Sequence, residues 1–146
     1  KKTFTITELK RRERRKNPQA PFTTSTLQQE AAKKLGFGSK RTMRAAQRLY
    51  EGVELGKEGS VGLITYMRTD SSRVAESAAV AARDELLRSF GSEFLAPGPQ
   101  LFGTGKKDAN AQDAHEGVRP TDPARRPEDV AQFLKGKDAD LLRLYQ

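Results

Sequence analysis

The sequence predicts a mainly α-helical domain with one short β-hairpin, in a helix-turn-helix or winged-helix-like (CAP-like) arrangement. Three observations support this prediction. Apolar residues recur at helical spacing in two adjacent segments, residues 25–35 and 39–50, which only a short glycine-containing turn separates. An alternating segment with three glycines, residues 53–67, is typical of a hairpin. A longer segment with helical spacing then covers residues 72–90.

The N-terminal residues are predicted to lie outside this domain. Thr3–Leu9 alternates apolar and polar residues, which predicts a short strand. Lys10–Ala20 is basic, contains a proline and is predicted to be a linker. We therefore divide the chain into residues 1–20 and a domain of residues 21–146.

Two helices are predicted next, each bounded by residues that commonly cap helices. Ser25 is expected to be the N-cap of the first, in a capping box with Gln28, and Gly36 is expected to stop it. Ser39 is expected to cap the second, which ends at Gly52. The expected buried faces are Leu27, Ala31 and Leu35 in the first helix and Met43, Ala46, Leu49 and Tyr50 in the second.

The hairpin is expected to follow the second helix directly. We predict a short strand near Val53–Leu55, a turn at Gly56–Ser60 and a second strand over Val61–Met67. Two helices followed by such a hairpin approach a winged-helix arrangement.

The longest predicted helix begins at Ser71 or Ser72 and ends at Phe90, with Asp70 as a candidate N-cap. Residues 91–111 contain several glycines and two prolines, and are predicted to be a loop. The expected buried stripe of this helix is Val74, Ala78, Ala81, Leu86 and Phe90.

The C-terminal part is predicted to be helical in pieces. Gln112–Val118 is expected to form a helical turn that Pro120 terminates. Pro127, followed by two acidic residues, suits the start of a helix that ends near Gly136. Lys137–Gln146 is expected to begin a last helix.

Charge is distributed unevenly along the chain. Residues 1–50 hold 14 Lys and Arg against three Asp and Glu, a net charge of +11, whereas residues 51–146 hold 13 against 16, a net charge of −3. A basic half of this kind favours a polyanionic partner, most simply nucleic acid. The simpler interpretation of the run Lys10–Lys16 alone is a solvated charged segment.

Composition excludes several classes of site. The chain has no cysteine, which rules out disulfides and zinc–thiolate sites and fits a reducing cytoplasm. A single histidine, His115, rules out a histidine-rich metal cluster. No apolar run approaches the roughly 20 residues of a membrane-spanning helix, so no membrane partner is expected.

The string ITYMRTDS, residues 64–71, holds the strongest chemical candidates. A tyrosine hydroxyl, with a pKa of about 10, is a weak nucleophile at neutral pH, but a nearby cation stabilises its anion. In an extended strand Arg68 would share a face with Tyr66 and could grip two phosphate oxygens. For Tyr66 alone, the simpler interpretation is a half-buried strand aromatic.

The second candidate group surrounds His115. It is the one side chain that ordinarily titrates near neutral pH, and its spacing from Arg119 would place both on one face of a helix. Composition alone would make His115 an ordinary surface residue. Glu116 is a possible general acid, a role that we discount.

The ITYMRTDS string resembles the active-site segment of bacterial DNA topoisomerases of the type IA family. The strings PFTTSTLQQ (residues 21–29) and QDAHEGVRPTD (residues 112–122) resemble two further motifs of that family, in the same order. The resemblance extends over residues 21–146. It implies that residues 1–20 are a hinge strand and linker from a neighbouring domain, and that residues 21–146 are the movable DNA-cleavage domain.

The resemblance also implies an activity. Such enzymes cut one DNA strand, hold its 5′ phosphate on tyrosine and relax negative supercoils. Magnesium is bound by a separate domain, and this chain has neither that domain's acidic cluster nor a phosphate-binding loop. The chain alone is therefore expected to be an inactive monomer. Its expected partners are DNA, especially single-stranded, and the other enzyme domains, in the bacterial cytoplasm at the nucleoid.

Carried over by position, the family's motifs assign roles to individual residues. The expected catalytic residues are Tyr66, Arg68 and His115. The expected DNA contacts are Arg68, Asp70, His115 and Arg119, with Lys33 and Arg48 as further phosphate contacts suggested by charge. The resemblance also implies that Asp70 can pair with the histidine.

Two alternatives remain from the sequence. A non-enzymatic helix-turn-helix DNA-binding protein would use Tyr66 as a core residue. A tyrosine recombinase also forms a phosphotyrosine, but that class needs a His-x-x-Arg element before the tyrosine, whereas here His115 follows it.

Overall fold

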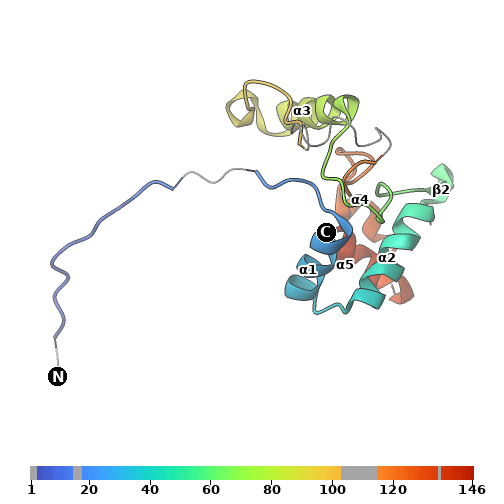
Figure 1. The fold of residues 1–146 in the computed structure, drawn as a ribbon, viewed down its shortest axis with the longest axis horizontal. Helices are drawn as coiled ribbons and strands as arrows, with labels where there is room; N and C mark the ends of the chain where they lie inside the picture. The colour runs from blue at the N-terminus through green and yellow to red at the C-terminus, as the bar shows by residue number, and fades with distance from the viewer. Residues whose placement is uncertain (1–2, 15–17, 103–114, 135) are drawn as a thin grey trace.

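Most helices of the chain are gathered around one hydrophobic core. The computed structural model describes residues 3–14, 18–102, 115–134 and 136–146, and of Lys137 the backbone only. Helix α1 spans Thr24–Leu35, α2 Ser39–Glu51, α4 Pro127–Ala131 and α5 Ala139–Tyr145. These helices lie close together, whereas α3 (Glu76–Phe90) lies to one side of them (Figure 1). The predicted mainly helical fold is confirmed.

The core joins α2, the segment after it and the C-terminal helices. Leu49, Leu63, Met67, Val130 and Leu134 are all fully buried there. Burial of a large apolar side chain stabilises the fold by about 1.5–3 kcal/mol, so these residues fix the positions of the segments that hold them.

Helix α5 packs against α1 and α2, and ion pairs reinforce the contact with α2. Arg41 binds Asp140 through two hydrogen bonds of 2.7 and 2.6 Å, and Arg48 binds Asp138 at 2.6 Å. The hydrogen bonds from Arg41 hold the pKa of Asp140 below its usual range. The last helices thus complete the core although they are distant in sequence.

The start of α1 differs from the prediction by two residues. Thr23, not Ser25, is the N-cap: its Oγ1 accepts the Thr26 N–H at 3.3 Å, and Thr26 Oγ1 accepts the Thr23 N–H at 2.8 Å. Several hydroxyl residues in a row offer alternative caps, and the local sequence cannot choose among them. The predicted stop at Gly36, with φ +69°, is confirmed.

Thr23→Ala is therefore expected to lower the free energy of unfolding by about 1 kcal/mol, because the Thr26 N–H loses the hydroxyl that accepts it. In a chain of 146 residues this corresponds to a drop in melting temperature of about 2–4 °C. Thermal unfolding followed by circular dichroism measures it. Ser25→Ala is the matched control, and a larger loss from Ser25 than from Thr23 would restore the original assignment.

The second helix agrees with the prediction apart from its N-cap and part of its buried face, and the predicted stop at Gly52 is confirmed. Gly38 rather than Ser39 is its N-cap. Thr42 and Ala45 are buried beside the expected Ala46 and Leu49, Met43 is partly buried, and Tyr50 is 41% exposed. The Thr42 hydroxyl donates to the Gly38 carbonyl oxygen at 3.1 Å, which lets this polar side chain enter the core.

The hairpin forms but is shorter than predicted. Strand β1 (Val53–Glu54) pairs antiparallel with β2 (Ser60–Val61), and a 3₁₀ turn, η1 (Gly56–Glu58), connects them. The predicted continuation of the second strand to Met67 is wrong, because the chain leaves β1 and Ile64 instead forms a bridge with Pro120. The structure is thus mainly helical with a two-stranded sheet, and the winged-helix arrangement stays a prediction.

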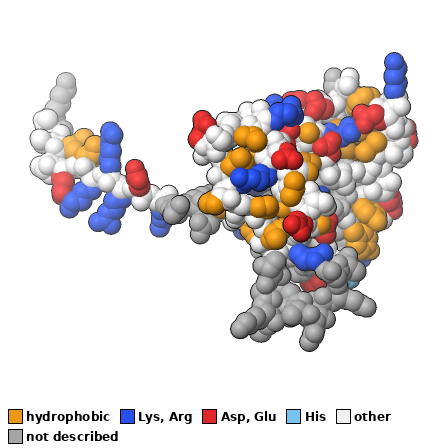
Figure 2. All heavy atoms as spheres, turned by 90° about the horizontal axis from the view of Figure 1, so that it is seen from above, with side chains coloured by type: hydrophobic (Ala, Val, Ile, Leu, Met, Phe, Trp, Pro, Cys, Tyr) orange, Lys and Arg blue, Asp and Glu red, His pale blue; other side chains and the backbone are white. Residues whose placement is uncertain are grey.

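The long helix α3 begins four to five residues later than predicted. Its N-cap is Ala75, and the stripe predicted to be buried is wrong: Ala79 is the buried residue of α3, while Leu86 and Phe90 are 41% and 59% exposed. A 3₁₀ turn, η2 (Ser92–Phe94), follows and packs against α3. Hydrophobic and charged side chains are interspersed over the face of the molecule seen in Figure 2.

The strand predicted at Thr3–Leu9 is not formed. This segment runs away from the helices without a partner strand (Figure 1), and Phe4 and Ile6 are 89% and 87% exposed. A strand needs a hydrogen-bonding neighbour, and the described residues supply none. Lys and Arg side chains project along this N-terminal segment in Figure 2.

The C-terminal helices are shorter than predicted. Helix α4 begins at Pro127 as expected but ends at Ala131, and α5 begins at Ala139 after a 3₁₀ turn, η3 (Gly136–Asp138). Asp129 accepts the Arg126 N–H at 2.9 Å, which fixes the start of α4. Among the described residues, no helix is long and apolar enough to cross a membrane.

Candidate functional site

Three segments that are distant in sequence meet on one side of the core. They are Phe22–Thr24, Thr65–Thr69 and Gly117–Arg119, and we call their meeting point the three-segment junction. Each comes from one of the three strings that the sequence singles out. The hydrogen bonds between them join residues at least 43 positions apart, so the junction is tertiary structure.

The central segment of the junction is extended. Val118 exchanges backbone hydrogen bonds with Phe22, at 2.7 and 3.3 Å. On its other side, the Thr65 N–H donates to the Arg119 carbonyl oxygen at 2.9 Å, and the Thr65 hydroxyl donates to that of Gly117 at 2.8 Å. The helical turn predicted for Gln112–Val118 is therefore wrong over residues 115–118, because strand-like pairing on two sides replaces it; residues 112–114 lie outside the described residues.

Close packing explains the glycine in this segment. A Cβ atom on Gly117 would lie 2.7 Å from Pro21 Cβ and 3.3 Å from Ser72 Cα. Gly117 thus lets the segment pass between the start of the domain and the chain that leads to α3.

Tyr66 lies on the surface of the junction. Its side chain is 44% exposed, between Thr65, which is held by hydrogen bonds, and Met67, which is fully buried. Its ring makes an edge contact with the Tyr50 ring, with 5.1 Å between centroids. The backbone around Tyr66 is fixed while its side chain remains accessible.

Arg68 is also exposed, on the other side of buried Met67. The chain bends at Met67 rather than continuing as a strand, and Tyr66 and Arg68 are two exposed side chains around a buried one. Within the described residues Arg68 forms no hydrogen bond or ion pair. An accessible guanidinium of this kind can bind a phosphate without first breaking an internal contact.

Asp70 is exposed and does not cap α3, so its predicted N-cap role is wrong. Hydroxyl groups hold the chain after it out of helical geometry: Thr69 Oγ1 accepts the Ser71 N–H at 3.0 Å and Ser71 Oγ accepts the Arg73 N–H at 3.1 Å. The Arg73 carbonyl oxygen then accepts the Gly117 N–H at 2.8 Å. The described residues show no hydrogen bond between Asp70 and His115.

Glu116 connects the central segment to the start of α3. Its Oε1 accepts the Ala75 N–H at 2.6 Å, and its Oε2 accepts an Arg119 guanidinium N–H at 2.7 Å. Both side chains of this ion pair are about one-fifth exposed. His115, the residue before Glu116, is exposed. In the absence of a helical turn, His115 and Arg119 do not share a helix face.

Removal of this carboxylate has a definite expected effect on stability. Glu116→Ala should lower the free energy of unfolding by about 1.5–3 kcal/mol, because a backbone N–H and a guanidinium lose a charged acceptor. Urea unfolding monitored by circular dichroism measures this. Glu76→Ala, at an exposed acid in the first turn of α3, is the control and should cost no more than about 1 kcal/mol. Equal losses would show that the Glu116 contacts contribute nothing specific.

The remaining candidate phosphate contacts, Lys33 and Arg48, take no part in the hydrogen bonds described for the three-segment junction. Lys33 in α1 lies 3.5 Å from Glu30, and Arg48 in α2 pairs with Asp138. In the described part of the chain, neither has a hydrogen bond or ion pair to the junction. A phosphate contact at Arg48 would have to compete with Asp138, and both assignments stay predictions.

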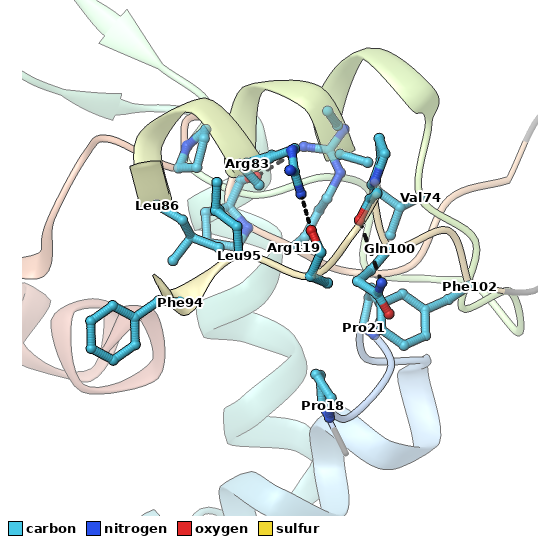
Figure 3. A pocket seen from close by; sticks show the side chains of 18 residues that line it. Pro18, Pro21, Val74, Arg83, Leu86, Phe94, Leu95, Gln100, Phe102 and Arg119 are labelled. Atoms are coloured by element: carbon cyan, nitrogen blue, oxygen red, sulfur yellow. Dashed lines mark hydrogen bonds between the residues drawn. The ribbon is translucent and has the colours of Figure 1, made fainter. Parts of the chain in front are cut away.

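A cavity of about 340 Å³ lies beside the junction, between α3 and the loop after η2. Val74, Leu86, Phe94 and Phe102 contribute apolar walls, and Arg119 contributes to its edge (Figure 3). Arg83 of α3 donates to the Ala96 carbonyl oxygen and holds this loop against the helix. Among the described residues, no group of three His, Asp or Glu side chains gathers as a metal site.

Sequence reasoning missed the residues that assemble the junction. Thr24 and Thr65 join the three segments, and neither is a candidate site residue from the sequence. Glu116, weighed there only as a general acid, instead connects the central segment to the start of α3. The run of hydroxyls at residues 23–26 is the available signal: capping is its simple interpretation, and the family resemblance implies a role in holding the domain fold and hinge. The partners of these side chains lie too far along the chain for a local pattern to identify them.

Comparisons with known proteins give the same family for the whole chain. A family model described as DNA topoisomerase matches residues 1–146. Over 139 residues the chain is 50% identical to DNA topoisomerase 1 from two strains of Xylella fastidiosa, Temecula1 and 9a5c, in matches that cover 95% of this chain. The chain spans 17% of the length of these relatives.

A solved structure agrees with these matches. The fold is similar to that of full-length topoisomerase I from Thermotoga maritima, with a TM-score of 0.70 and 43% identity, over 88% of this chain and 18% of that one. The family model and the relatives together show that this chain belongs to the DNA topoisomerase family.

Proposed function

We propose that this chain is the tyrosine-bearing cleavage domain of a type IA DNA topoisomerase, which relaxes negative supercoils by transient cleavage of one strand. The observation that carries the proposal is the three-segment junction. It gathers the family's three motifs and leaves Tyr66 and Arg68 exposed on either side of a fully buried residue. The proposed substrate is DNA, especially single-stranded.

The proposed reaction is a transesterification. The Tyr66 oxygen attacks the phosphorus of a DNA phosphodiester, and the bond from phosphorus to the 3′ oxygen breaks. The tyrosine loses its proton and the departing 3′ oxygen gains one, so a 5′-phosphotyrosine ester and a free 3′ hydroxyl result. One ester replaces another, so the reverse attack reseals the strand.

The other residues have supporting roles in this proposal. Arg68 binds the phosphate and stabilises the charge that develops on its oxygens. Arg119, within the junction, and His115, two residues before its central segment, contact the DNA backbone, and Asp70 lies near the bound DNA. Lys33 and Arg48 are proposed as outer phosphate contacts. Magnesium, which supplies charge neutralisation when bound, is held by another domain of the full-length enzyme.

The wider setting is also a proposal. Residues 1–20 act as the hinge side and residues 21–146 as the movable domain, with a helix-turn-helix and winged-helix-like arrangement of α1, α2 and the hairpin. The isolated chain is a monomer without cleavage activity, and the full-length enzyme acts in the bacterial cytoplasm at the nucleoid. No observation favours the non-enzymatic DNA-binding alternative.

The polarity of the covalent link tests the proposal. Single-stranded oligonucleotides labelled at the 3′ or the 5′ end would be incubated with a full-length enzyme that carries this chain and quenched with SDS. We expect the 3′-labelled fragment to stay on the protein and the 5′-labelled fragment to be released. Retention of the 5′-labelled fragment in place of the 3′-labelled one would exclude the type IA reaction. If the protein retained neither label, the non-enzymatic DNA-binding alternative would replace the proposal. The isolated chain should retain neither label.

A further inference from the structure

The hydroxyl of Thr24 lies against the backbone on both sides of Arg68. Thr24 Oγ1 donates to the Met67 carbonyl oxygen at 2.8 Å, with the Thr69 carbonyl oxygen as a second acceptor at 3.1 Å. Thr24 Oγ1 also accepts the Thr69 N–H at 2.9 Å. The Thr24 backbone N–H also donates to the Thr69 carbonyl oxygen at 2.9 Å. One residue at the start of α1 thus binds both neighbours of Arg68.

These contacts are not needed to cap α1. Thr23 and Thr26 form the complete capping box, and neither of their hydroxyls binds the Met67–Thr69 backbone in the described structure. Among the described residues, the Thr24 hydroxyl by contrast has partners only in that backbone, 43 and 45 residues away. Capping therefore explains the hydroxyls on either side of Thr24 but not its own.

As a consequence, the backbone of Arg68 is held in place while its side chain remains accessible. Met67 is fully buried, and Thr69 is held through both its N–H and its carbonyl oxygen. The Cα of Arg68 between them is therefore restrained, while its side chain is exposed. Catalytic groups lose rate when their backbone shifts by about 1 Å, even if the group itself is intact.

We infer that Thr24 is a positioning residue for cleavage, which acts by holding the backbone on both sides of Arg68. This inference rests on the proposed function of Arg68 and assigns a role to the PFTTST string beyond helix capping. The β-branched side chain of threonine restricts its rotamers, so its hydroxyl is held in the orientation that these contacts need.

The test is a double-mutant cycle in a full-length topoisomerase that carries this chain. The rate of adduct formation in a single turnover at saturating DNA, and the DNA dissociation constant, would be measured for Thr24→Val, Arg68→Ala and the double variant. We expect Thr24→Val alone to slow adduct formation by about 10- to 100-fold with little change in DNA affinity. In the Arg68→Ala background it should cause no further slowing, because the residue that it positions is gone.

Two further variants separate positioning from stability. Thr24→Ser keeps the hydroxyl with looser rotamers and should retain most of the rate. Thr26→Val is the matched control: it removes a hydroxyl from the cap of α1 without touching Met67–Thr69, and should lower the melting temperature while the cleavage rate holds. Should Thr24→Val fail to fold, the same cycle run with Thr24→Ala, which also removes the hydroxyl, tests the coupling. Amide hydrogen exchange at Thr69 should be faster in either Thr24 variant than in the unmodified enzyme.

The outcomes distinguish this inference from the proposed function. If Thr24→Val slows the Arg68→Ala enzyme as much as the unmodified one, or slows neither, the positioning role is wrong while the reaction stands. If Arg68→Ala forms the adduct at the normal rate, the role of Arg68 and the inference fail together. Loss of the rate in Thr26→Val to the same extent would show that any disturbance of α1 suffices, and would also overturn it.

Discussion

Replacement of Tyr66 by phenylalanine is expected to abolish the covalent adduct with DNA in a full-length enzyme that carries this chain. The substitution removes the oxygen that attacks phosphorus and leaves the ring, so the edge contact with Tyr50 can persist. Because the side chain is 44% exposed and its hydroxyl has no hydrogen bond among the described residues, the fold should be unaffected. Adduct formation on a 3′-labelled strand and the melting temperature measure the two effects.

Tyr50→Phe provides the matched control for this experiment. Tyr50 is 41% exposed, contacts Tyr66 through its ring and loses the same hydroxyl group. We expect this variant to form the adduct at close to the normal rate. Adduct formation by Tyr66→Phe would show that another residue is the nucleophile. Inactivity of both variants would show that the loss of either hydroxyl suffices, so that the experiment no longer singles out the Tyr66 oxygen.

The second large effect is expected at Arg68. Arg68→Ala should slow cleavage by roughly 10²-fold or more, because a donor aimed at developing phosphate charge contributes about that factor. Arg68→Lys should also be impaired if the guanidinium binds two phosphate oxygens, since an ammonium group cannot reproduce that geometry. Single-turnover cleavage rates at saturating DNA separate this effect from affinity.

Arg44→Ala controls for the loss of one positive charge. Arg44 is exposed on α2 and, within the described residues, has no hydrogen bond or ion pair. Arg44→Ala should weaken DNA binding modestly and reduce the salt dependence of that binding, with little change in the cleavage rate. Similar cleavage rates for Arg68→Ala and Arg44→Ala would remove Arg68 from the mechanism. Arg68 would then contribute only positive charge to DNA binding.

Most helices could be predicted from the sequence because their signals are local. The stop at Gly36, the α2 segment and the start of α4 at Pro127 depend on residues within a few positions of each other. The prediction failed where a distant partner intervened. Helix α3 starts at Glu76, after a stretch that Gly117 and Glu116 hold by hydrogen bonds from 41 or more residues away.

The apolar pattern of α3 was a second source of error. Its spacing predicts a buried stripe, but the helix lies beside the main group of helices (Figure 1), and Leu86 and Phe90 of that stripe are 41% and 59% exposed. Periodicity identifies a helix and its apolar side, whereas burial depends on what packs against that side.

The sequence by itself determined the chemical groups of this protein: a tyrosine two residues before an arginine, a single histidine and a basic N-terminal half. These are properties of residue identity and local spacing. Only the tertiary structure decided how the three motifs meet, with Thr24 bound on both sides of Arg68 and Glu116 bound to the start of α3. Local propensities act over one or two helical turns, whereas hydrogen bonds between segments form only once the buried core has brought those segments together.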